Sequence, residues 1–196
     1  LQILTYTHHL TTMLFGIFLS AFFLGVKQNK KNVCILLGGG AVSGLFFLIC
    51  NTVFGSLFTE AVYPIFVHLP LFLLLVFYYR FRWLPSIISI MTAYLCCQFS
   101  NWAGIFALSL SGLDWVYYLV RIIVTVAVFA FLSRYLCQTT ALLFAKSDRE
   151  LYILGAMPFV YYVFDYSTTK FSMLLYSGNK VVVEFLAFAM CISYVI

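Results

Sequence analysis

The chain has 196 residues, of which 64% are hydrophobic and only 9% are charged, and its mean hydropathy is +1.05. Ordinary soluble domains are about 45–50% apolar and about 25% charged, and a soluble fold of this size still needs a polar exterior. The composition therefore excludes a soluble globular domain and predicts an all-α, polytopic membrane protein in contact with the lipid bilayer. In such a protein the net charge of +5 is a topology signal rather than a sign of a nucleic-acid partner.

Seven segments have the length of a membrane-spanning helix, which needs about 20 mostly apolar residues. They are residues 8–26, 33–55, 61–79, 84–110, 115–137, 151–171 and 181–196. Pro158 predicts a kink in the sixth segment, and Pro64 and Pro70 predict a bend in the third. The stretch QTTALLFAKSDRE, residues 138–150, is predicted to lie along the inner membrane surface. The glycines at 38–40 predict close helix packing.

The basic residues predict the orientation of these segments. Alternate connections place eight of them on one side: Lys27, Lys30, Lys31, Arg80, Arg82, Arg134, Lys146 and Arg149. Only Lys170 and Lys180 fall on the other side, and basic residues concentrate on the cytoplasmic side of membrane proteins. We therefore expect an N-terminus outside the cell and a C-terminus in the cytoplasm. Residues 1–196 form a single transmembrane domain, and we expect a fragment, because the chain lacks an initiator Met and stops within an apolar run.

Polar side chains inside the predicted segments gather in the outer half of the membrane. Arg121 lies about 9 Å below the outer boundary at 1.5 Å per residue, and His68, Asn101, Asp165 and Glu184 lie in the same half. A charged side chain that faces lipid costs about 3 kcal/mol, so we expect Arg121 to face the interior and pair with Asp165, with Glu184 or with both. Three interpretations remain open: an ion pair that only holds helices together, an outward-facing ligand pocket lined by these five residues, and an Arg121 that reaches the lipid head groups.

The other polar motifs indicate no chemistry in this chain. No zinc-protease, nucleophile-elbow or paired-acid pattern occurs, so no enzymatic activity is expected of these residues. His8 and His9 are interpreted as solvated end residues, and the six cysteines are scattered through apolar runs without metal-ligand spacing. No metal site or cofactor is predicted.

Four stretches carry a resemblance to a known family. They are FTEAVYPIFVHLPLFLLLVFYYRFRW, AYLCCQFSNW, YYLVRIIVTVAVFAFLSRYL and FVYYVFDYSTTKFSMLLYSGNKVVVEFLAFAMCISYVI. They resemble the N-terminal membrane domain of GHKL-domain sensor histidine kinases of Gram-positive bacteria, a group similar to the peptide-pheromone receptor kinases of accessory-gene-regulator type. The resemblance implies a multi-pass domain of the bacterial plasma membrane, a homodimer, and a cytoplasmic ATP-dependent histidine kinase that acts on a response regulator. No part of that kinase lies in these 196 residues.

The resulting hypothesis is a sensor that binds an extracellular or membrane-embedded ligand and relays the signal through the seventh segment. Arg121 suits a carboxylate, such as a peptide C-terminus or a small acidic metabolite. The rival hypothesis is a small transporter, or the substrate-binding subunit of one, in which the polar residues hold a solute. A scaffold without a ligand is the third hypothesis.

Overall fold

The computed structural model describes residues 1–55, 58–59 and 62–170. All regular structure in these residues is helical, which confirms the all-α prediction for this part of the chain. The α-helices are α1 (Gln2–Phe23), α2 (Lys30–Phe54), α4 (Leu69–Leu73), α5 (Trp83–Cys96), α6 (Gln98–Ser111), α7 (Asp114–Tyr135), α8 (Cys137–Phe144) and α9 (Asp148–Lys170). Two π-helices, η1 (Pro64–His68) and η2 (Leu74–Tyr78), flank α4. The predicted seventh segment, 181–196, lies outside the described residues.

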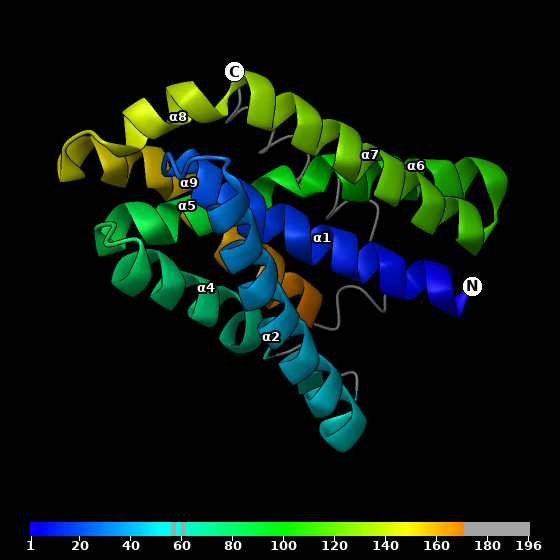
Figure 1. The fold of residues 1–196 in the computed structure, drawn as a ribbon. Helices are drawn as coiled ribbons and strands as arrows, with labels where there is room; N and C mark the ends of the chain where they lie inside the picture. The colour runs from blue at the N-terminus through cyan, green and yellow to red at the C-terminus, as the bar shows by residue number, and fades with distance from the viewer. Residues whose placement is uncertain (56–57, 60–61, 171–196) are drawn as a thin grey trace.

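Helix α1 is the centre of the bundle and contacts α2, α5, α7 and α8 (Figure 1). Its second half is deeply buried, with Leu19 and Ala21 fully inaccessible. The glycines of α2 allow it to cross α1 closely, because a Cβ on Gly40 would lie only 3.2 Å from Cδ1 of Ile17. The predicted role of this glycine run is thus confirmed at Gly40. Beyond α1, helices α6 and α7 form an antiparallel pair, and α9 packs against α5.

Three helical stretches among the described residues are long and apolar enough to cross a membrane: α2, the combined α5–α6 stretch Trp83–Ser111, and α7. The segment predicted at 84–110 is divided at Cys97, whose backbone N–H bonds to the carbonyl of Tyr94 three residues earlier. The hydroxyl of Ser100 then bonds to the carbonyl of Cys97 at 2.9 Å. A straight helix of 29 residues would be about 44 Å long, well beyond the roughly 30 Å hydrocarbon core of a bilayer.

The segment Pro64–Tyr78 differs from an ordinary α-helix at both ends. Two wide π-turns form here, separated by the five residues of α4, and the bend predicted from Pro64 and Pro70 stays a prediction. A proline has no N–H to donate, so the ladder of backbone hydrogen bonds is altered around Pro64 and Pro70. The π-turns place His68 at the end of η1 and direct its side chain toward α5 and α9.

Three connections that carry basic residues meet at one end of the bundle, on the left in Figure 1. We call this end the basic end. Arg82 donates to Asp148 Oδ1 and to the carbonyl of Lys146, both at 2.7 Å, which joins the start of α5 to the start of α9. Tyr79 Oη donates to Asn32 Oδ1 at 3.5 Å, which brings in the α1–α2 connection. A hollow of about 250 Å³ at this end is lined by Leu24, Arg80, Phe81, Arg82, Pro85, Ala141, Phe144 and Ala145. The stretch 138–150 contains most of the short helix α8, the connection at 145–147 and the first residues of α9.

Helix α9 begins with one half of a capping box, in which a glutamate of the first turn accepts from the residue before the helix. Glu150 accepts hydrogen bonds from the hydroxyl of Ser147 at 3.0 Å and from the backbone N–H of Ser147 at 3.2 Å. Together these hydrogen bonds hold the pKa of Glu150 below its ordinary 4.5. A carboxyl with a lowered folded pKa stabilises the fold above its unfolded pKa, and that contribution disappears as the pH falls through the folded value.

We expect Ser147→Ala to raise the pKa of Glu150 toward 4.5, because the variant loses the hydroxyl donor. The measurement is a pH titration of the ¹³C-labelled glutamate carboxyls by NMR, with the Glu150 signal assigned through Glu150→Gln. An unchanged Glu150 titration in the variant would show that the Ser147 hydroxyl does not lower this pKa.

Candidate functional site

Arg121 is on α7, one turn after Tyr117, and interacts with it in two ways. Its guanidinium donates a hydrogen bond to Tyr117 Oη and lies 5.1 Å from the centroid of the Tyr117 ring. Its aliphatic stem packs on α6 at Gly104, where a Cβ would come within 2.8 Å of Arg121 Cδ and 3.1 Å of Tyr117 Cδ2. Residue 104 must therefore be a glycine for Arg121 to lie between α6 and α7.

His8 lies close to Arg121 and is a correction to the sequence analysis. It is only 3% exposed, and its ring lies 5.8 Å from that of Tyr118, which precedes Arg121 by three residues on α7. The prediction of a solvated end residue was wrong because α1 begins at Gln2, six residues earlier than predicted. His8 is thus in the second turn of α1, on the face that packs against α7. We call Arg121, Tyr117, Tyr118, Gly104 and His8 the arginine site.

One donor of the arginine site has no acceptor. The Nε of Arg121 is buried and makes no hydrogen bond in the described structure. A buried donor without a partner costs about 1–3 kcal/mol, more for a charged group. An anion that reached this N–H, which is covered in the described packing, would satisfy it together with a neighbouring guanidinium N–H through two parallel hydrogen bonds.

A second polar cluster joins η1, α5 and α9. His68 Nδ1 lies 2.9 Å from Tyr162 Oη, and Tyr94 Oη donates to Asp165 Oδ2 at 2.5 Å. The rings of Tyr94 and Tyr162 lie 5.0 Å apart and connect the two hydrogen bonds. Asp165 is 6% exposed, so its carboxyl group is satisfied inside the protein rather than by water. We call His68, Tyr94, Tyr162 and Asp165 the aspartate cluster.

The predicted site residues are thus divided between two places. His68 and Asp165 share the aspartate cluster, whereas Arg121 lies between α7, α6 and α1. The predicted pairing of Arg121 with Asp165 is not formed, since the described ion pairs are Arg82–Asp148 and Lys146–Glu150 at the basic end. Asn101 donates to Gln98 Oε1 at 3.3 Å within α6. Glu184 lies outside the described residues.

The division has a simple physical reason. Depth in a membrane follows from position along a helix, and residues at one depth can still lie on different sides of a bundle. Helix α7 packs against α1 and α6, while α9 packs against α5. Arg121 and Asp165 therefore have different neighbours although both were assigned to the outer half.

Several site residues were missed by the sequence analysis, among them Tyr94, Tyr162 and His8. Tyr162 precedes Asp165 by three residues, which places both on one face of α9. Tyr94 carries no comparable signal, because its four-residue spacing to Gln98 crosses the break at Cys97. Interfacial tyrosines are common in membrane proteins, and this explains why the aromatic residues were not distinguished from one another.

Within the described ranges no group of three or more His, Cys, Asp or Glu side chains could hold a metal ion. The two clusters offer hydrogen bonds, one cation and one buried carboxyl group. Comparisons of the chain with protein-family models, with curated proteins and with solved structures give no match.

Proposed function

We propose that this chain is the membrane-spanning sensor domain of a bacterial signalling protein, and that the arginine site binds its ligand. Support for a bilayer setting comes from the outward-facing side chains of the long helices. Leu45 on α2 is 60% exposed and Ile123 on α7 is 58% exposed, and many large apolar residues on these helices are similarly accessible. An exposed apolar surface of this extent must be shielded from water, and a lipid bilayer would shield helices of this length.

The basic end supports the proposed orientation. The connections at 27–31, 79–82 and 145–149 were assigned to the cytoplasm from their charges, and they meet at one end of the bundle. Arg121 and His8 lie toward the other end, where α1 and α7 begin. In a bilayer this end would face outward, because basic connections remain in the cytoplasm. The proposed sensor therefore receives its ligand from outside or from the outer leaflet.

The observation that carries the proposal is the unused, buried Nε of Arg121 in a site built from three helices. A ligand can signal only if it binds two packings of the bundle with different affinity. An anion bound to Arg121 would stabilise the packing in which α1, α6 and α7 are close together. That change would be relayed by the chain beyond α9 to a cytoplasmic histidine kinase, in a homodimer that serves a response regulator. The kinase output rests on the family resemblance alone.

A transporter is the second candidate, and the break at Cys97 favours it. Transporters hold solutes at discontinuous helices near the middle of the membrane, and Gln98 and Asn101 directly follow this break. Solute uptake by vesicles that contain the chain would support this candidate. A native reading frame that continues into a histidine-kinase domain would support the sensor.

We expect hexanoate to stabilise the chain through Arg121. In phosphatidylcholine nanodiscs, hexanoate at about ten times its Kd should raise the free energy of unfolding by about 1.4 kcal/mol, or the thermal midpoint by about 3–6 °C. Arg121→Gln should abolish this shift, because it removes the charge and the paired donors. Neutral hexanol should give no shift with either protein.

Arg134→Gln is the matched control, since Arg134 is on the same helix at the opposite end and lies over the ring of Tyr135. It should respond to hexanoate like the wild type. Arg121→Lys keeps the positive charge and tests whether hexanoate binding needs the planar guanidinium. We expect a smaller stabilisation by hexanoate than in the wild type. An equal response of wild type and Arg121→Gln would remove the arginine site from the proposal.

A further inference from the structure

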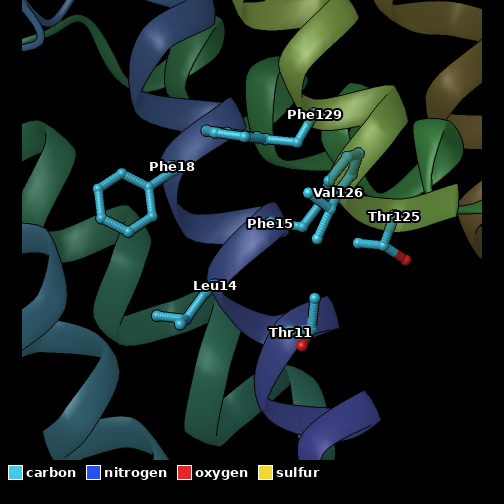
Figure 2. A pocket seen from close by; sticks show the side chains of 7 residues that line it. All are labelled: Thr11, Leu14, Phe15, Phe18, Thr125, Val126 and Phe129. Atoms are coloured by element: carbon cyan, nitrogen blue, oxygen red, sulfur yellow. The ribbon is translucent and has the colours of Figure 1, made fainter. Parts of the chain in front are cut away.

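An apolar groove runs between α1 and α7 next to the arginine site. It has a volume of about 170 Å³ and is lined by Thr11, Leu14, Phe15, Phe18, Thr125, Val126 and Phe129 (Figure 2). The rings of Phe15 and Phe18 lie 6.2 Å and 6.4 Å from that of Phe129. Val126 is 55% exposed, so the groove is open to the surroundings on its α7 side.

The groove and the arginine site lie on adjoining turns of the same two helices. Thr125 follows Arg121 by four residues and Thr11 follows His8 by three, so each pair shares a helix face. Figure 2 shows the two threonines at the opposite end of the groove from Phe18 and Phe129. The threonine end is therefore the end next to Arg121, and the aromatic end is farther along both helices.

Two polar groups are left without hydrogen bonds near this junction. Thr125 is 3% exposed and its hydroxyl has no partner in the described structure, and the same holds for the Nε of Arg121. A threonine inside a helix commonly bonds to a backbone carbonyl one turn earlier, and the described structure shows no such bond for Thr125. One cation and one free hydroxyl thus lie at the threonine end of an otherwise apolar groove.

In the bilayer that we propose, an acyl chain fits this groove. A cavity of about 150 Å³ holds a molecule the size of benzene, so the groove accommodates about six carbons and its open side leaves room for the rest of a chain. Because the bilayer and the groove are both apolar, the acyl chain of a ligand by itself gains little from entering the groove rather than staying in the lipid. The head group decides the occupant, and here it faces Arg121.

The charge at this end favours a singly charged head group such as a carboxylate over a phosphate monoester. Arg121 lies one helical turn before Thr125 on α7, whereas Arg82 and Lys146 lie where the connections at 79–82 and 145–149 meet, at the other end of the bundle. One guanidinium balances the single charge of a carboxylate through paired hydrogen bonds. A phosphate monoester, with a charge of about −1.5 to −2, would leave charge unbalanced.

We infer that the ligand of the arginine site is a long-chain carboxylate of the fatty-acid class, with its head group on Arg121 and its chain in the groove between α1 and α7. This inference rests on the proposed function and narrows the ligand from any anion to an anionic single-chain amphiphile. Entry from the outer leaflet requires no path through water, because the groove is open beside Val126.

The test uses dodecanoate with a photoreactive diazirine near the middle of its chain, at the depth that the groove accommodates, in nanodiscs adjusted to equal bilayer concentrations of probe. Mass spectrometry should locate the wild-type label on groove residues such as Phe18 and Phe129. Val126→Trp fills the groove and should reduce this label by about fivefold or more. Ile123→Trp, which adds the same ring to an exposed position on α7, should leave it unchanged.

The head group is tested in the same experiment. Arg121→Gln should reduce the groove label about tenfold, and Arg134→Gln should leave it unchanged. A groove label that survives Val126→Trp, or a label spread evenly over the lipid-facing surface, overturns the inference. If hexanoate still stabilises the protein through Arg121 in that case, the proposed function stands and only the acyl-chain site in the groove is contradicted. If Arg121→Gln alters neither response, both fall.

Discussion

Replacing Gly155 with alanine should lower the free energy of unfolding by about 1–3 kcal/mol, the usual cost of one methyl group too many in a packed interior. Gly155 lies where α9 crosses α5, and a Cβ there would lie 2.7 Å from both Cδ1 and Cγ1 of Ile88. Ile88 is only 4% exposed, so its side chain has little space to move into. The thermal midpoint of the purified chain, which shifts by about 2–4 °C per kcal/mol for a protein of this size, measures the loss.

Two further variants make this prediction specific to the helix crossing. Gly16→Ala in α1 introduces the same methyl group with nothing within 4 Å of it, and should be neutral or stabilising by up to about 1 kcal/mol. Ile88→Ala alone leaves a cavity and should destabilise by about 2–5 kcal/mol. Combined with Gly155→Ala it should cost less than the sum of the two changes, by about 0.5 kcal/mol or more, because the new methyl group enters the vacated space. Strict additivity would show that the contact does not limit α5–α9 packing.

Removing the hydroxyl of Tyr94 should destabilise the aspartate cluster by about 1.5–3 kcal/mol if the carboxylate is charged, the range for hydrogen bonds to charged groups. Tyr94→Phe keeps the ring contacts with His68 and Tyr162 but deletes the donor to Asp165 Oδ2. Asp165 is 6% exposed, so water cannot easily replace the lost donor. Thermal unfolding of the purified variant measures the effect.

Tyr152→Phe is the control for this change, because Tyr152 is on α9, like Asp165, but its side chain is 59% exposed. It should be within about 0.5 kcal/mol of the wild type. A double-mutant cycle of Tyr94→Phe with Asp165→Asn should give a coupling energy of about 0.5–3 kcal/mol. A coupling energy near zero would mean that the hydrogen bond contributes nothing to the packing of α5 on α9.

The division of the polar residues changes how a membrane signal would pass through the bundle. The arginine site joins α1, α6 and α7, so the ligand binding that we propose there would act on these three helices, whereas the aspartate cluster connects η1 to α5 and α9. The centre of the bundle connects them, because α1 packs against both α5 and α7. A change in the α1–α7 spacing can therefore reach α9, the described helix nearest the proposed output, through α1 and α5.

The amino-acid sequence by itself determined where most of the described helices lie and which connections share an end. Hydropathy is a property of each segment alone, so α2, α7 and α9 appear within a few residues of the predicted bounds. Charge on the connections likewise predicted that residues 27–31, 79–82 and 145–149 lie together, and Arg82 does reach Asp148 and the carbonyl of Lys146. The start of α1 was missed because the polar residues Gln2 to His9 are helical without being strongly apolar.

Only the tertiary structure decided which faces of these helices meet. In water an apolar stripe marks the buried side of a helix, but a helix in lipid is apolar all round and has no such stripe. On α7 only Thr125 and Leu132 are fully buried, although most of the helix is apolar. What brings Arg121 to α6 and Tyr94 to Asp165 is the fit of particular side chains against glycines and rings at the crossings, such as Gly104 and Gly155. That fit depends on residues far apart in the chain, and so the sequence did not identify the side chains that Arg121 and Asp165 contact.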